Sequence, residues 1–340
     1  MMRKPNLKSD EFEAALADNL RAFERSCGDR QRRTSADLVC LGESHGSHLF
    51  ALDRKVLPGT GGLLLRAPRF LSDDVLLDPG WGTLATARRF NIALSRVGVI
   101  LVSHCHLDHT GDLHPLLLTL SLAKKRPLLI GNATTINGAR HQPSTLPRYF
   151  RELCKDVIVA KPGKEIRAGV LKIIPFSTKH RENRDVSGHS LGYILRFSGS
   201  PAHQIGFLSD GPLGRVPSSL MKMLRKCAVL VINIGTISSD LKAPSHSKVF
   251  DNALCLHGLE LFLTELGKEV GSVKKIAVTH LGAELLEIRA ESMKRFLART
   301  NTSDLPNLLQ LILKSMVRHA LGNGVSTTVL REGNRLEVPK

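Results

Sequence analysis

Three histidines and an aspartate fall within six residues of the stretch VILVSHCHLDHTGDL, which covers residues 99–113. Imidazole and carboxylate groups are suitable ligands for zinc and similar divalent ions. Residues two apart point the same way in an extended segment, so His104 and His106 can hold one ion. Asp108 and His109, beyond the turn, can face a second ion. A solvated histidine loop is the alternative, but the apolar strand before the cluster and the TGDL turn after it fix its geometry.

Metal-competent residues also end several other apolar runs. Asp78, His180, Asp210 and His280 each follow a short β-rich segment, as His104 does. Strands of a sheet that end at the same edge can bring such residues together, and functional groups usually lie in the loops at strand ends. The sequence therefore predicts one shared site that holds two metal ions.

The elements that must position these residues alternate between strand and helix patterns. Strand-like runs cover residues 38–42, 61–67, 74–80, 97–104, 127–132, 170–178, 191–197, 204–210, 228–235 and 274–280. Helical patterns cover residues 113–124, 251–267, 283–298 and 305–320. Such alternation is typical of a layered α/β domain. Residues 326–338 are expected to form a hairpin around Glu332, Gly333 and Asn334.

An amphipathic helix is expected over residues 9–30, followed by a linker. We therefore divide the chain into an N-terminal helical extension over 1–34, suited to docking a partner protein, and one domain over 35–340. The six cysteines are irregularly spaced, and there is neither a secretory signal nor a membrane-spanning run, which predicts a cytoplasmic protein that does not enter a membrane. A homodimer is compatible with the sequence. The 48 basic residues outnumber the 31 acidic ones and favour an anionic partner.

The order H-x-H-x-D-H after an apolar strand resembles the signature of the metallo-β-lactamase fold. The similarity extends over about 250 residues, from LVCLGES to VTHLG, and includes VLLDPGWGT and IGFLSDG. It implies a four-layered αβ/βα sandwich of two mixed β-sheets flanked by helices. It also implies two divalent ions, zinc first and manganese as the alternative. His104, His106 and a later histidine would hold the first ion and Asp108, His109 and His280 the second, with Asp210 bridging them.

Two residues compete for the remaining ligand position. His180 ends an apolar strand, whereas His189 lies nearer the LGY sequence that follows this motif in related phosphodiesterases. We favour His180 and keep His189 as the alternative, which could still contact substrate. Asp78 resembles the family's aspartate that orients a ligand histidine; an ordinary Asp-Pro-Gly turn is the other interpretation.

Within the fold, three segments resemble ribonuclease Z and related phosphodiesterases: LVCLGESHG with VLLDPGWGT, SLGYILRF, and the segment from LHGLEL to VTHLG. By this resemblance Asp108 would orient the nucleophile, and His257 would donate a proton to the leaving group. Lys179, Arg181 and Arg184 could bind flanking phosphates, or simply lie in a solvated loop. The chain departs from ribonuclease Z at Asn233, where that family has glutamate, and lacks a clear Gly/Pro-rich tRNA-gripping arm.

These features predict a dinuclear metal-dependent phosphodiesterase or nuclease that hydrolyses its substrate with a metal-activated water. Its substrate would be RNA, DNA, or a cyclic or oligonucleotide messenger rather than strictly tRNA. The alternative is a metallohydrolase of carboxylic esters, thioesters or lactones on the same fold, since a fold alone does not set function.

Overall fold

The computed structural model describes most of the chain. The described residues are 36–44, 59–67, 71–140, 142–182, 189–198, 204–211, 216–235, 256–269, 271–281 and 305–339. The expected N-terminal extension and the helix expected over 283–298 lie outside these ranges.

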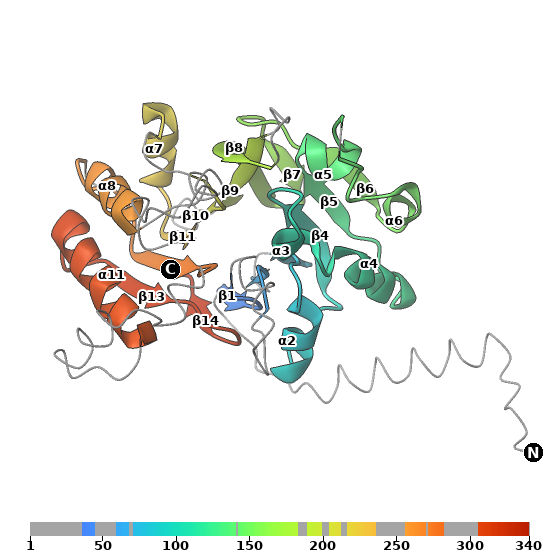
Figure 1. The fold of residues 1–340 in the computed structure, drawn as a ribbon, viewed down its shortest axis with the longest axis horizontal. Helices are drawn as coiled ribbons and strands as arrows, with labels where there is room; N and C mark the ends of the chain where they lie inside the picture. Colours follow the sequence, from blue (N-terminus) through green and yellow to red (C-terminus); the bar gives the residue numbers. More distant parts are fainter. Residues whose placement is uncertain are drawn as a thin grey trace, which may run out of the picture.

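Two seven-stranded mixed sheets make up the centre of the described part of the chain (Figure 1). The first sheet, in spatial order, contains β14 (Arg335–Glu337), β1 (Asp37–Cys40), β2 (Leu63–Arg66), β3 (Asp74–Leu77), β4 (Val97–Val102), β5 (Leu128–Gly131) and β6 (Asp156–Val159). The second contains β13 (Ser326–Val329), β12 (Lys275–Thr279), β11 (Val229–Asn233), β10 (Gln204–Leu208), β9 (His189–Phe197), β8 (Leu171–Arg181) and β7 (Ile166–Ala168). Strands β3 to β6 and strands β10 to β13 run parallel to their neighbours within each set.

Helices cover the outer face of each sheet (Figure 1). On the first sheet lie α2 (Thr83–Arg89), α4 (Leu113–Leu122), α5 (Ala133–Asn137) and α6 (Arg148–Glu152), whereas the short α3 (Leu107–Thr110) follows the end of β4. On the second lie α7 (Ser218–Leu224), α8 (Leu256–Leu266) and α11 (Leu305–Leu321). The predicted four-layered α/β sandwich is therefore confirmed. Within the described residues, every helix is too short or too polar to cross a membrane.

The sequence of strand β4, VGVILV, is apolar throughout because both faces of this strand are buried. Val99 and Leu101 join the core between the two sheets, whereas Ile100 and Val102 join the core under the helices of the first sheet. A strand buried on both faces needs a continuous apolar run, because its side chains alternate between the faces. The polar residues that follow β4 therefore stand at the end of a rigid, fully packed element.

Two contacts hold the end of β4 against the second sheet. The Tyr193 hydroxyl donates to the Val102 carbonyl at 2.7 Å, and the Leu191 amide donates to the Ser103 carbonyl at 2.9 Å. Burial raises the pKa of the Tyr193 hydroxyl well above its ordinary value, so it remains a donor. The two sheets are thereby aligned beside the histidine-rich loop.

The hairpin predicted over residues 326–338 is wrong. Strand β13 pairs with β12 in the second sheet, while β14 pairs with β1 in the first, so the turn crosses between the sheets. Glu332 in that turn accepts hydrogen bonds from the Gly59 amide and the Thr86 hydroxyl and pairs with Arg89. These contacts, together with burial of β13 and β14 in different cores, outweigh the local hairpin signal. The β1–β14 pairing joins the two ends of the described chain.

Candidate metal centre

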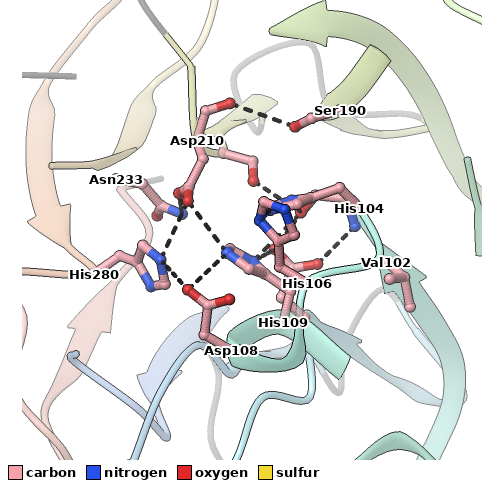
Figure 2. A network of polar contacts seen from close by, with 12 residues as sticks. Val102, His104, His106, Asp108, His109, Ser190, Asp210, Asn233 and His280 are labelled. Atoms are coloured by element: carbon pink, nitrogen blue, oxygen red, sulfur yellow. Dashed lines mark hydrogen bonds and ion pairs between the residues drawn. The ribbon is translucent and has the colours of Figure 1, made fainter. Parts of the chain in front are cut away.

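The predicted site residues converge at one edge of the two sheets (Figure 2). His104 to His109 follow β4 in the first sheet, while Asp210 and His280 follow β10 and β12 in the second. They form two groups, His104/His106/His180 and Asp108/His109/Asp210/His280, and within each group the potential ligand atoms all lie within 4.8 Å of one another. The groups are adjacent, because the ring centroids of His104 and His109 are 4.0 Å apart.

The first group points three ring nitrogens at a common centre. His106 Nδ1 lies 3.0 Å from His104 Nε2 and 3.3 Å from His180 Nε2. Two nitrogens bound to one tetrahedral zinc at about 2.0–2.1 Å would lie roughly 3.3 Å apart. The spacing of this group therefore fits a shared divalent ion.

In His104 and His106, the ring nitrogen that points away from the common centre carries the proton, because it hydrogen-bonds to a neighbouring group. His106 Nε2 lies 2.8 Å from the Glu182 carbonyl, which can only accept, so this nitrogen carries the proton and Nδ1 does not. His104 Nδ1 lies 2.9 Å from the Ser103 hydroxyl, which gives its own proton to Asp78, so His104 Nε2 is the bare nitrogen. Two lone pairs then face each other at 3.0 Å. A cation between them relieves this repulsion, and neutral imidazole is the form that binds metal.

The second group combines two carboxylates with two imidazoles. His280 Nε2 lies 3.3 Å from Asp108 Oδ2 and 3.4 Å from Asp210 Oδ2. His109 Nε2 lies 3.4 Å from Asp210 Oδ2, and makes no hydrogen bond within the described structure. All four side chains are buried. This nitrogen–oxygen donor set suits zinc or manganese.

Asn233 fixes the orientation of Asp210. Its Nδ2 donates to Asp210 Oδ1 at 2.9 Å, which leaves Oδ2 turned toward His109 and His280 (Figure 2). A glutamate in place of this amide would set a second carboxylate beside Asp210 and repel it. Asn233 instead supplies a hydrogen-bond donor to Asp210.

Asp78 supports the second group from behind. Its Oδ2 lies 2.9 Å from His109 Nδ1, and its two oxygens accept from the Ser103 amide at 2.6 Å and from the Ser103 hydroxyl at 2.8 Å. The carboxylate thus orients the His109 ring with Nε2 toward Asp210. Asp78 thus contacts a candidate ligand histidine in addition to forming an Asp-Pro-Gly turn, and its orienting role stays a prediction.

Glu182 is a buried residue that the sequence reasoning missed. Its side chain accepts from Asn132 Nδ2 and, at 3.4 Å, from the Cys105 amide, while its carbonyl accepts from His106. It therefore joins the end of β8, which carries His180, to the loop that carries His104 and His106. Its position two residues after a candidate ligand was the available signal, but a single glutamate in a charged segment is a weak one.

The backbone at the site is unusual in three places. Asp78, Lys179 and His280 have positive φ angles of 46°, 62° and 59°. Non-glycine residues rarely adopt this conformation, and such strain concentrates at functional sites. Gly80 is needed for a different reason: a Cβ there would lie 2.0 Å from the carbonyl oxygens of Asp108 and Thr60. The turn that follows Asp78 can approach the backbone of Asp108 only because residue 80 has no side chain.

Burial and charge set the protonation of these side chains. Burial, reinforced by His109, His106 and His180, holds the pKa of His104 well below its usual range. Burial disfavours the charged forms of His280 and Asp210, but their mutual attraction prevails. It raises the pKa of His280 to about 9 and holds that of Asp210 well below its ordinary value. Protons therefore compete with a metal ion for the second group.

This competition predicts how the stability of the metal-free protein depends on pH. The pKa of His280 in the folded state, about 9, exceeds the value of about 6.5 expected when unfolded. Its stabilising contribution is complete below about pH 6.5 and is lost as the pH rises through 9. The melting temperature of chelator-treated protein should therefore fall between pH 6.5 and 9, while zinc affinity rises. Scanning fluorimetry would measure the melting temperature; His280→Gln should flatten the profile, and a flat wild-type profile would contradict the argument.

The remaining predicted residues are placed less completely. Lys179 is exposed beside His180, while for Arg181, His189 and His257 the structure describes the backbone only. Arg181 pairs with His189 between β8 and β9, and His257 lies in the first turn of α8. Arg184 lies outside the described residues. The structure brings the side chain of His180 to the first group. The side chain of His189 is not described, so the preference for His180 over His189 stays a prediction.

The fold is that of the metallo-β-lactamase proteins. YhfI from Bacillus subtilis superimposes with a TM-score of 0.59 at 14% identity, covering 89% of this chain and 99% of that protein. Yeast PDE1 gives a TM-score of 0.58 at 14% identity over 90% and 100% of the two chains. The short form of human tRNase Z gives 0.55 at 15% identity over 89% and 100%. At these identities, the similarity concerns the fold.

The family model of the β-lactamase superfamily domain matches residues 73–261, more than half of the chain, and the chain belongs to this superfamily. Ribonuclease Z of Methanopyrus kandleri is 28% identical over 131 residues, 36% of this chain and 44% of that protein. Ribonuclease Z of Parabacteroides distasonis is 26% identical over 171 residues, 48% and 52% of the two. An uncharacterised protein of Methanocaldococcus jannaschii is 26% identical over 136 residues, 39% and 48%. The chain thus spans about half the length of these curated relatives.

Proposed function

We propose that this protein is a dinuclear metal-dependent phosphodiesterase or nuclease. The observation that carries the proposal is the pair of adjacent ligand groups, in which Asp210 Oδ2 lies 3.4 Å from both His109 Nε2 and His280 Nε2. Similarity to ribonuclease Z over part of the chain and the net charge of +17 support a phosphodiester substrate. A strict tRNA-processing role is not proposed, because no clear counterpart of the tRNA-gripping arm is found in the sequence.

Each residue of the centre has a proposed role. His104, His106 and His180 would hold one divalent ion, and Asp108, His109 and His280 a second, with Asp210 facing both. Zinc is the proposed metal, with manganese as the alternative. Bound ions would supply Lewis-acid chemistry that lowers the pKa of water and neutralises charge on phosphoryl oxygens.

The protein's own side chains would complete the reaction. Asp108 would orient the attacking water with its carboxylate, and His257 would donate a proton to the departing oxygen. Lys179 lies exposed next to His180 and, with Arg181 and Arg184, would bind phosphates that flank the scissile bond. Residues 35–340 would form the hydrolase domain.

A substrate panel tests the proposal. Zinc- or manganese-loaded protein would be assayed on bis-nitrophenyl phosphate, cyclic nucleotides, oligonucleotides and tRNA precursors, beside a lactone and a thioester. We expect cleavage of at least one phosphodiester. His106→Ala should lower its rate at least about 100-fold, since partners that merely support a ligand are worth 10–100-fold.

His319→Ala is the matched control, because His319 is exposed in α11, and it should retain full activity. Cleavage of the lactone or thioester alone would refute the proposal in favour of a carboxylic ester hydrolase. Activity that survives in His106→Ala would refute the assignment of the site.

A further inference from the structure

One buried hydroxyl lies behind both ligand groups. Ser103, at the end of β4, has no exposed surface. Its Oγ lies 2.9 Å from His104 Nδ1 in the first group. It also lies 2.8 Å from Asp78 Oδ2, the oxygen that holds His109 of the second group. The Ser103 hydroxyl therefore contacts His104 of the first group directly and His109 of the second group through Asp78.

The hydrogen bonds around the Ser103 hydroxyl determine which of its neighbours donate a proton and which accept one. A serine hydroxyl offers one proton and two acceptor lone pairs. Its proton goes to Asp78, and Ser209, from the second sheet, donates to Ser103 at 2.8 Å. The remaining lone pair must accept the Nδ1 proton of His104. The His109 Nδ1 proton goes to Asp78, at 2.9 Å, rather than to Ser103, at 3.5 Å.

We propose that Ser103 is a positioning residue that couples the two candidate ion positions. It fixes the His104 tautomer that presents Nε2 to the first ion. It also fixes the Asp78 carboxylate that turns His109 Nε2 toward the second. Groups that hydrogen-bond to metal-binding histidines set both ring orientation and tautomer. The inference rests on the proposed ion sites and is independent of phosphodiester chemistry.

The first test uses the unaltered protein. Long-range ¹H–¹⁵N NMR spectra of metal-free, full-length protein, at a pH where the ring is neutral, would show which His104 nitrogen carries the proton. We expect Nδ1–H. A proton on Nε2 would overturn the proposal, and this measurement does not depend on any variant folding.

The second test compares two identical truncations in the same hydrogen-bond chain. Ser103→Ala leaves His104 Nδ1 without its acceptor, whereas Ser209→Ala removes only a donor to Ser103. Zinc affinity would be measured by competition with a chromophoric chelator. We expect Ser103→Ala to weaken the binding of both zinc equivalents about 10–100-fold. Ser209→Ala should weaken zinc binding less, because it leaves the Ser103 contacts with His104 and Asp78 in place. Equal weakening in both variants, or none in Ser103→Ala, would overturn the coupling.

These readouts separate the inference from the proposed function. A protein that binds two zinc ions with this dependence on Ser103, yet cleaves no phosphodiester, would refute only the function. A protein that cleaves phosphodiesters with unchanged zinc affinity in Ser103→Ala would refute only the coupling.

Discussion

Asp210→Asn is expected to abolish hydrolysis while leaving the fold intact. The change is isosteric, but it replaces the negative oxygen that faces His109 and His280 at 3.4 Å with a neutral group. Loss of a group that only supports a ligand lowers activity 10–100-fold, so loss of the proposed shared ligand should lower it at least about 100-fold. Zinc content, measured by elemental analysis after dialysis, should fall below two equivalents.

Asn233→Ala provides the graded comparison. It removes the donor to Asp210 Oδ1 but leaves the carboxylate, so activity should lie between those of Asp210→Asn and the wild type. Circular dichroism would verify that both variants are folded. An Asp210→Asn protein that keeps two zinc ions and more than a tenth of the wild-type rate would contradict the assigned role of Asp210.

Asp78→Ala is expected to be strongly destabilising even without metal. The change leaves three buried donors without their acceptor: the Ser103 amide, the Ser103 hydroxyl and His109 Nδ1. Each unsatisfied buried donor costs about 1–3 kcal/mol, so the free energy of unfolding should fall by at least about 3 kcal/mol. That is a large part of the roughly 5–15 kcal/mol typical of a domain. Urea denaturation of chelator-treated protein would measure it.

Asp156→Ala is the matched control for that variant. Asp156 is exposed at the start of β6, and its carboxylate accepts from the neighbouring Val157 amide, so its loss should change stability by no more than about 0.5 kcal/mol. Asp78→Asn keeps an acceptor oxygen and should fall between the two. An Asp78→Ala protein as stable as the control would show that water replaces the carboxylate without penalty.

The sequence predicted most of the fold and the composition of both ligand groups. Residues such as His104 and Asp210 follow long apolar strands, where an ionisable group is costly unless it has a purpose. The sequence did not predict β6 or β7. Both lie at the outer edges of their sheets and are partly exposed; β7 has no continuous apolar run, and the apolar run of β6, Val157–Ala160, is only four residues long.

Other features arise only from the tertiary structure. Besides contacting its neighbour His104, the Ser103 hydroxyl donates to Asp78, which follows β3, and accepts from Ser209, which follows β10 in the other sheet, so no local pattern shows these two bonds. The sequence of the turn at Glu332 is likewise typical of a hairpin. The turn instead connects the two sheets, and its contacts with α2 and with Gly59 are not visible in the local sequence.

The distribution of ligands along the chain has a consequence for biosynthesis. His104, His106, Asp108 and His109 leave the ribosome together, long before Asp210 and His280. A nascent chain that binds a metal ion on this short segment before its second sheet exists loses part of the stabilisation that the same ion gives the native state.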